Sequence, residues 1–140
     1  LAVANEPGWE ASDWEINKTG ISYTYDTIRY FKEKYGTEYD LYFIIGADSA
    51  LELDKWYRIA DALELCTFVV ASRPGSTDKE NAIKKSLSAK HLTNIIWMRT
   101  PEIPISSTEI REKIQKGLSI DGLVPQAIVE YIRQRDLYRR

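Results

Sequence analysis

The sequence predicts an α/β fold of the Rossmann-like, doubly wound type, with a parallel sheet flanked by helices. Short apolar segments alternate with longer segments in which apolar residues recur at helical spacing. Parallel neighbours need a crossover connection, and the intervening helices supply it. The chain has 140 residues, 44% of them hydrophobic and 29% charged, which suits a single folded domain over residues 1–140.

Four segments are predicted to be extended. Residues 11–16 follow a Pro-Gly turn, and residues 40–46 form an apolar run that ends in Gly46, typical of a buried strand. Residues 67–72 and 94–98 are two further apolar runs of strand length. Residues 73–76 and 101–104, rich in proline, glycine and serine, are predicted to be loops and not domain boundaries.

Helices are predicted between these segments. Residues 24–35 place Ile28, Phe31 and Tyr35 on one stripe and are followed by Gly36, which favours a helix end. Residues 54–65 and 78–90 have similar patterns, and a final helix begins at Pro125. Tyr23, beside the first of these helices, is expected only to pack.

A further helix is predicted from Ser106, where the chain could bind an anion. Ser106 and Glu109 stand three apart as a capping box, Ile110 and Ile114 repeat on one face, and Gly117 favours the end of the helix.

The first turn of that helix suits a phosphate. Its initial N–H groups lack partners within the helix, and the aligned peptide dipoles favour an anion there. Arg111 can reach the same anion with its planar fork of donors, and Ser107 or Thr108 can add a hydroxyl. The alternative is an ordinary capped helix with a solvated arginine, and residues 105–111 alone do not decide between the two.

Two other features allow two interpretations each. Gly46 and Asp48 follow a predicted strand. In one interpretation they form a strand-to-helix turn in which the Asp48 carboxylate caps the next helix. In the other, a nucleoside lies against the backbone at Gly46 and Asp48 accepts hydrogen bonds from the ribose hydroxyls. Trp56 and Tyr57 either pack against the protein or provide an indole on which a pyridine ring can stack.

Composition narrows the classes of partner. A net charge of −2 gives no overall basic field for nucleic acid or an anionic membrane, so phosphate binding must be local. Cys66, the sole cysteine, excludes an internal disulfide, lies in an apolar run and is expected to be a buried thiol. No apolar run reaches the roughly 18 residues of a membrane helix, so a cytoplasmic location is expected.

Five short motifs resemble those of bacterial nicotinate-nucleotide adenylyltransferases, in the order of that family. Residues 22–27 resemble S-Y-T-x-D-T, residues 44–48 resemble I-I-G-A-D, and residues 55–57 resemble K-W-Y. Residues 73–75 resemble the R-P-G turn, and residues 105–111 resemble the I-S-S-T-x-I-R motif of the wider nucleotidylyltransferase superfamily. Since five motifs span residues 22–111 in order, a chance match is a poor explanation.

The resemblance implies transfer of an adenylyl group from ATP to nicotinate mononucleotide, with Mg²⁺, giving deamido-NAD and pyrophosphate. It implies that Trp56 stacks on the nicotinate ring, that the Tyr57 N–H and the Thr24 hydroxyl receive the carboxylate, and that Arg73 lies nearby. Gly46 and Asp48 would hold the nucleoside. The phosphates would bind Ser106, Ser107, Thr108 and Arg111, with Arg111 and Ser107 stabilising the reacting phosphate; no residue is assigned to a metal, and a homo-oligomer is compatible with the resemblance.

The family's G-G-T-F-D-P-x-H-x-G-H motif, whose two histidines stabilise the triphosphate, has no counterpart in this sequence. The only histidine is His91, in a polar stretch, and it is expected to lie at the surface. The chain therefore resembles the C-terminal part of the family, and we expect it to be nearly inactive by itself, with its sheet completed by a segment from elsewhere. The alternatives are a nucleotidylyltransferase with another phosphate acceptor and a non-catalytic nucleotide-binding fragment.

Overall fold

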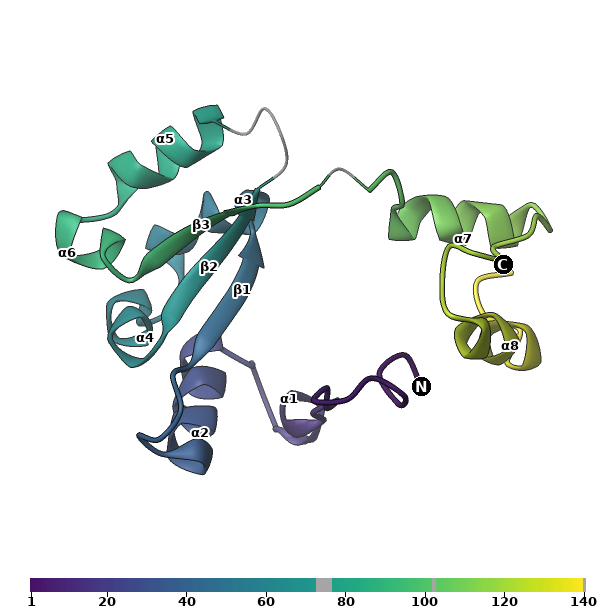
Figure 1. The fold of residues 1–140 in the computed structure, drawn as a ribbon, viewed down its shortest axis with the longest axis horizontal. Coiled ribbons are helices and arrows are strands. Elements are labelled where there is room, and N and C mark those ends of the chain that lie inside the picture. The colour runs from purple at the N-terminus through teal and green to yellow at the C-terminus, as the bar shows by residue number, and fades with distance from the viewer. Residues whose placement is uncertain (73–76, 102, 140) are drawn as a thin grey trace. The chain divides into compact units, whose positions relative to one another are not determined.

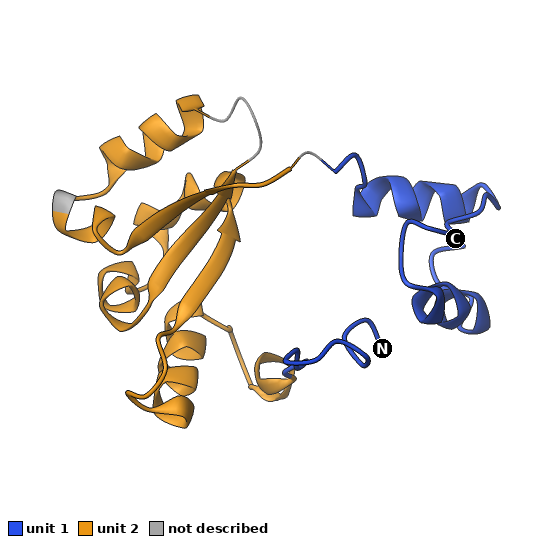
Figure 2. Cartoon of the chain, viewed as in Figure 1, with its two compact units in different colours: residues 1–12, 103–140 blue, residues 13–102 orange. Residues whose placement is uncertain are grey.

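The computed structural model of the chain describes residues 1–72, 77–101 and 103–139. It contains two compact units, one formed by residues 13–102 and the other by residues 1–12 together with 103–140 (Figure 2). One division falls within residues 101–104, which were predicted to be a loop inside one domain. The assignment of residues 1–140 to a single domain stays a prediction.

The larger unit is built on a three-stranded parallel sheet in the order β1 (Tyr42–Gly46), β2 (Thr67–Ser72) and β3 (Ile95–Arg99) (Figure 1). The helices are α1 (Trp14–Asn17), α2 (Thr24–Tyr35), α3 (Ala47–Ala50), α4 (Ile59–Leu65), α5 (Thr77–Ser86) and α6 (Ala89–Leu92), with a 3₁₀ turn, η1, at Leu53–Lys55. Helices connect successive parallel strands, so the predicted α/β fold with a parallel sheet is confirmed.

The helices bury one face of this sheet. On that face Phe68 and Val70 of the central strand are fully buried, and the register places Phe43 beside Phe68 and Ile45 beside Val70. Residues of α2, α4 and α5 join the same apolar cluster, among them Ile28, Leu63 and Ile83. Burying large side chains of this kind stabilises the fold by roughly 1.5–3 kcal/mol each.

The opposite face of the sheet is open. Ile44 and Ile96 flank Val69 in the register, and only Val69, on the central strand, is buried. Ile44 is 65% exposed, so the expectation of a strand buried on both faces is wrong for β1. Parallel sheets usually carry cover on both faces, and the described helices of this unit cover only one.

Three predicted elements differ from the structure. Residues 11–16 do not form a strand; the chain turns into the four-residue α1, whose Trp14 ring stacks on Tyr30 with centroids 4.7 Å apart. The helix predicted over residues 78–90 is divided at Ser88, whose side chain caps α6. Residues 54–65 are likewise divided, because Trp56 and Arg58 leave helical geometry between η1 and α4.

The other helices and strands agree with the prediction to within two residues, with Pro125 as the N-cap of the last helix rather than its first residue, and the loop predicted at residues 73–76 lies outside the described residues. Helix α2 and strand β2 have the predicted bounds, and β1 and β3 differ from them by one or two residues. The second unit contains α7 (Ser107–Gln115) and α8 (Gln126–Gln134), and its core is formed by Ile114, Ile120 and Val129. Among the described residues, no helix is long and apolar enough to cross a membrane.

Candidate functional site

The start of α7 is capped as the sequence predicts. The Ser106 side chain accepts a hydrogen bond from the Glu109 N–H at 3.1 Å, and the Ser106 carbonyl accepts from the Ile110 N–H. Within the described residues, the reciprocal bond from the Ser106 N–H to the Glu109 carboxylate is not formed, so only half of the capping box is present. The N–H groups of Ser107 and Thr108 have no partner in the same part of the chain, and they remain available to an anion.

Arg111 lies on the same turn and is exposed. Its Nη2 approaches the Thr108 hydroxyl at 3.4 Å, a weak contact that directs the guanidinium toward the helix start. No carboxylate of the described residues forms an ion pair with it. The hydroxyls of Ser107 and Thr108, the free N–H groups and the Arg111 guanidinium are therefore gathered on one helical turn.

The C-terminal end of α7 also forms where the sequence predicts it. Gly117 has φ +68°, a left-handed conformation that glycine adopts without strain, and its N–H bonds to the Ile114 carbonyl at 3.0 Å. The next N–H, of Leu118, bonds to the Lys113 carbonyl at 2.8 Å, completing a Schellman-type end. Ile110 and Ile114 face the apolar core of this unit, as predicted from their spacing.

Gly46 and Asp48 lie at the carboxyl end of β1. Gly46 caps α3 with φ −76°, and a Cβ added there would meet nothing within 4 Å. Neither backbone strain nor crowding inside the protein therefore requires glycine at the strand-to-helix turn. Asp48 lies in the first turn of α3, not at the cap, and its carboxylate pairs with Lys79 of α5 at 2.5 Å.

Trp56 and Tyr57 lie in the turn between η1 and α4. The Trp56 ring is half-buried and meets Phe43 and Phe68 edge-on, each at 6.5 Å between centroids. The packing interpretation thus holds for part of the indole. The Tyr57 ring, in contrast, is 51% exposed.

Arg58 ends this turn in an unusual conformation. Its φ of +52° is left-handed, which is costly for a residue with a Cβ. Its Nε donates to the Asp61 carboxylate at 2.5 Å, and its guanidinium lies 4.1 Å from the centre of the Tyr25 ring. The hydrogen bond to Asp61 also raises the pKa of the guanidinium above its usual value.

Two hydrogen-bond donors near this turn are unused. Neither the Thr24 hydroxyl, in the first turn of α2, nor the Tyr57 N–H has a partner in the portion of the chain that the structure describes. The rings of Tyr23 and Tyr57 lie 4.4 Å apart, so the segments carrying the two donors are in contact. The sequence predicted that Tyr23 packs, but it did not indicate Tyr57 as the residue against which it packs.

The remaining candidates contribute less. Arg73 lies outside the described residues. Cys66 is buried as predicted, and burial raises the pKa of its thiol to about 12, so it is not a nucleophile at neutral pH. His91 is half-buried rather than fully at the surface. No group of three or more His, Cys, Asp or Glu residues suited to a metal ion occurs in residues 1–72, 77–101 and 103–139.

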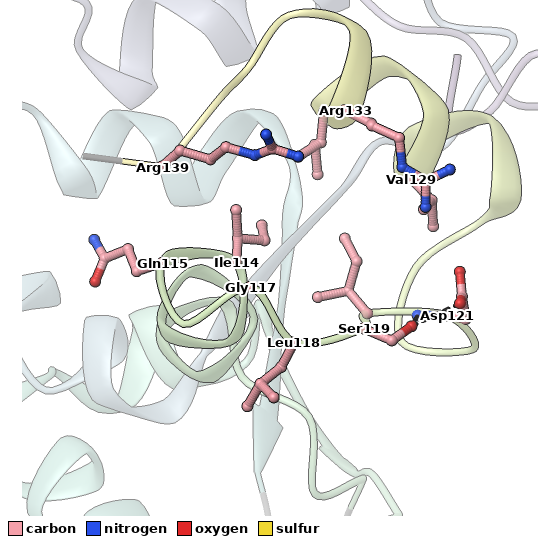
Figure 3. A pocket seen from close by; sticks show the side chains of 11 residues that line it. Ile114, Gln115, Gly117, Leu118, Ser119, Asp121, Val129, Arg133 and Arg139 are labelled. Atoms are coloured by element: carbon pink, nitrogen blue, oxygen red, sulfur yellow. Dashed lines mark hydrogen bonds between the residues drawn. The ribbon is translucent and has the colours of Figure 1, made fainter.

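A pocket of about 580 Å³ lies within the second unit (Figure 3). Ile114, Val129 and Ile132 supply apolar lining, and Arg133 and Arg139 add positive charge. None of the predicted site residues lines this pocket. The predicted site residues within the described part of the chain thus fall into two groups. One group lies on α7 in the second unit, and the other lies at the ends of α2 and β1 and in the Trp56 turn of the larger unit.

These features define a class of protein, an α/β protein in which free backbone donors, hydroxyls and an arginine gather at a helix start, a combination suited to binding an anion. Comparison with known proteins agrees. Residues 1–113 match the family described as cytidylyltransferase-like. A probable nicotinate-nucleotide adenylyltransferase of Clostridium tetani is 44% identical over 99% of this chain, and one of Moorella thermoacetica is 40% identical over 99%. The chain therefore belongs to the cytidylyltransferase-like family, in the branch of the nicotinate-nucleotide adenylyltransferases.

Solved structures agree on the fold. A Plasmodium falciparum nicotinic acid mononucleotide adenylyltransferase complexed with APC matches with a TM-score of 0.58 and 20% identity, and the same enzyme complexed with NaAD matches equally well. The match covers 86% of this chain and 60% and 58% of those chains. The chain spans 69% of the Clostridium relative and 64% of the Moorella relative.

Proposed function

We propose that the protein containing this chain transfers an adenylyl group from ATP to nicotinate mononucleotide, forming deamido-NAD and pyrophosphate in NAD biosynthesis. The observation that carries the choice of acceptor is the pair of unused donors, the Thr24 hydroxyl and the Tyr57 N–H, on two segments held together by the Tyr23–Tyr57 contact. A carboxylate only accepts hydrogen bonds, whereas an amide also donates, so donors alone favour the acid. Membership of the family supports the reaction itself.

The remaining groups have roles in the same proposal. Trp56, partly buried and anchored by T-shaped contacts with Phe43 and Phe68, stacks on the pyridine ring, and its π system favours a cationic pyridinium. The open surface at Gly46 admits the nucleoside, and Asp48 exchanges Lys79 for ribose hydroxyls. Arg73 is assigned to the nicotinate side by the motif alone.

Phosphate binding is assigned to the start of α7. Ser106 shapes the turn through its cap, while the Ser107 and Thr108 groups and Arg111 face the phosphates. Charge developing at the attacked α-phosphorus is stabilised by donors that are already in place before reaction. In this proposal Arg111 and Ser107 are the catalytic residues of the chain.

Mg²⁺ enters the proposal only with ATP. The described residues hold no cluster that would cage it, and Mg²⁺ commonly binds through substrate phosphates and water with few protein ligands. When bound, it would neutralise phosphate charge. The binding and positioning steps assigned to this chain do not depend on it.

We further propose that the 140-residue chain is nearly inactive alone and that the protein works in the cytoplasm. The sequence holds one histidine, His91, and no paired histidines for the triphosphate. Loss of a single charge-stabilising donor can raise a barrier by about 2.7–4 kcal/mol, so loss of two would suppress turnover.

The test compares the protein from the complete coding region with the 140 residues in a coupled pyrophosphate-release assay. We expect the complete protein to use nicotinate mononucleotide in preference to nicotinamide mononucleotide, and the 140 residues to show little turnover. Preference for another phosphate acceptor would overturn the acceptor assignment. Absence of turnover with every acceptor would favour a non-catalytic nucleotide-binding protein.

A further inference from the structure

The Tyr57 peptide N–H is held between two anchored aromatic side chains. On one side Trp56 is fixed by its edge contacts with Phe43 and Phe68. On the other side the Tyr57 ring lies on the Tyr23 ring, with centroids 4.4 Å apart and planes inclined by 34°. A backbone donor between two fixed side chains has little freedom to turn away from its acceptor.

The contact between Tyr23 and Tyr57 also joins two separate segments. Tyr23 is the N-cap residue of α2, and its carbonyl accepts the N–H groups of Asp26 and Thr27 at 3.0 and 3.3 Å. Thr24, whose hydroxyl is unused, is the next residue. A ring contact at Tyr23 therefore sets the position of the Thr24 hydroxyl relative to the Tyr57 N–H.

Arg58 and Tyr25 reinforce the same arrangement. Tyr25 is buried, meets the edge of the Tyr57 ring at 6.3 Å, and receives the Arg58 guanidinium on its face at 4.1 Å. The Asp61 carboxylate holds that guanidinium from α4. These contacts offset the cost of the left-handed backbone at Arg58, which directs the chain from the Trp56 turn into α4.

Core burial does not explain these side chains. Tyr57 is about half exposed, Tyr23 is 37% exposed, and neither belongs to the apolar core of the unit. Exposed aromatic side chains that contact each other across two segments contribute to position more than to burial.

We propose that Tyr23, the Tyr57 ring and Arg58 are positioning residues for recognition of the nicotinate carboxylate. They hold the Thr24 hydroxyl and the Tyr57 N–H at a separation that one carboxylate can bridge. The proposal rests on the proposed function and names the specificity-determining contacts behind it. It predicts that acid-over-amide selectivity depends on a ring contact that touches no substrate atom.

The test uses Tyr23 variants of the protein from the complete coding region. Tyr23→Ala removes the ring, Tyr23→Phe keeps it without the hydroxyl, and Tyr39→Ala is the matched control. Tyr39 is also an exposed ring that meets another tyrosine, Tyr35, at 6.0 Å, and it has no role in the site. Arg58→Lys keeps the charge but loses the planar group that lies on Tyr25.

For Tyr23→Ala we expect kcat/KM with nicotinate mononucleotide to fall about two- to tenfold, the range expected for loss of one aromatic pair, through a higher KM and with kcat nearly unchanged. The values for nicotinamide mononucleotide and the KM for ATP should stay the same, so the acid-to-amide ratio falls. Tyr23→Phe and Tyr39→Ala should match the unmodified protein, and Arg58→Lys should lower the same ratio. Binding of nicotinate mononucleotide without ATP, measured by calorimetry, should weaken by the same factor.

The outcomes separate this inference from the proposed function. If the unmodified protein does not favour the acid, the proposed function fails first. If it favours the acid and Tyr23→Ala keeps the full ratio, the positioning role is wrong and the proposed function stands. A fall in kcat with both mononucleotides, or an equal effect of Tyr39→Ala, would indicate general structural loss and would also overturn the positioning role.

Discussion

Ser106 offers a way to separate helix capping from anion binding. Its side chain accepts the Glu109 N–H at 3.1 Å while the residue itself is exposed. Ser106→Ala removes this cap without opening a cavity, so the free energy of unfolding should fall by about 1 kcal/mol. Ser106→Asp keeps an acceptor in the same place and adds a negative charge that the helix dipole favours by about 0.3–1 kcal/mol.

The two substitutions should differ in their effect on nucleotide binding. A carboxylate at the cap would stand roughly 5 Å from a phosphate bound at the free N–H groups of Ser107 and Thr108. Two unit charges at that separation repel by about 1–3 kcal/mol when the effective dielectric constant lies between 80 and 20. Ser106→Asp should therefore raise the KM for ATP by roughly 5- to 150-fold while stability is kept, and Ser106→Ala should lower stability with a smaller effect on KM.

The assay measures urea unfolding by circular dichroism and the KM for ATP on the protein from the complete coding region. Ser88 is the matched control, because it caps α6 by accepting the His91 N–H at 3.4 Å and has no role in the site. Ser88→Asp should keep both stability and KM. If Ser106→Asp binds ATP as the unmodified protein does, no phosphate lies at the start of α7 and the reasoning is wrong.

Three further predictions concern charge, geometry and packing. Burial raises the pKa of the Cys66 thiol to about 12, so the stability that the neutral thiol contributes is complete below the ordinary thiol pKa near 8.5 and is lost as pH rises toward 12. Over this range the urea midpoint of the unmodified protein should fall by more than that of Cys66→Ala. An equal fall in the two proteins would show that the Cys66 thiol does not have a raised pKa. Arg111→Ala should lower kcat by about 10²–10³ in steady-state assays. Arg111→Lys keeps the charge but loses the planar, forked set of donors, so kcat should fall by less. Equal activity of the two variants and the unmodified protein would remove Arg111 from the site. Phe68 is fully buried and contacts the rings of Phe43 and Trp56, at 5.3 and 6.5 Å between centroids. Phe68→Leu should therefore lower the free energy of unfolding in urea by about 1–2 kcal/mol and raise the KM for nicotinate mononucleotide more than the KM for ATP. An unchanged ratio of these two KM values would show that the position of Trp56 does not depend on this contact.

Local patterns accounted for much of the structure. The bounds of α2 and β2, the cap at Ser106 and the end of α7 at Gly117 follow from hydrogen bonds and backbone preferences within a few residues. The predicted capped helix start formed for the same reason, because a helix start leaves its first N–H groups free wherever it lies in the fold. That a phosphate binds there stays a prediction.

Contacts between distant segments decided the rest. A helical pattern over residues 54–65 could not indicate that Trp56 would turn toward Phe43 and Phe68, nor that Arg58 would adopt a left-handed conformation supported by Asp61 and Tyr25. Residues 11–16 were predicted to be extended because they follow a Pro-Gly turn. A strand, however, needs a neighbour to accept its backbone hydrogen bonds, and the described residues provide none there.

The sequence by itself determined the family, the parallel α/β arrangement and the identity of the chemical groups, because motifs, periodicity and helix caps each depend on residues close together in the chain. Only the tertiary structure decided which face of the sheet is covered and which donors stay unused. It also decided that Tyr23, more than thirty residues from Tyr57, lies against it. These properties depend on which side chains from distant parts of the sequence pack together and exclude water, and a local sequence pattern does not contain that information.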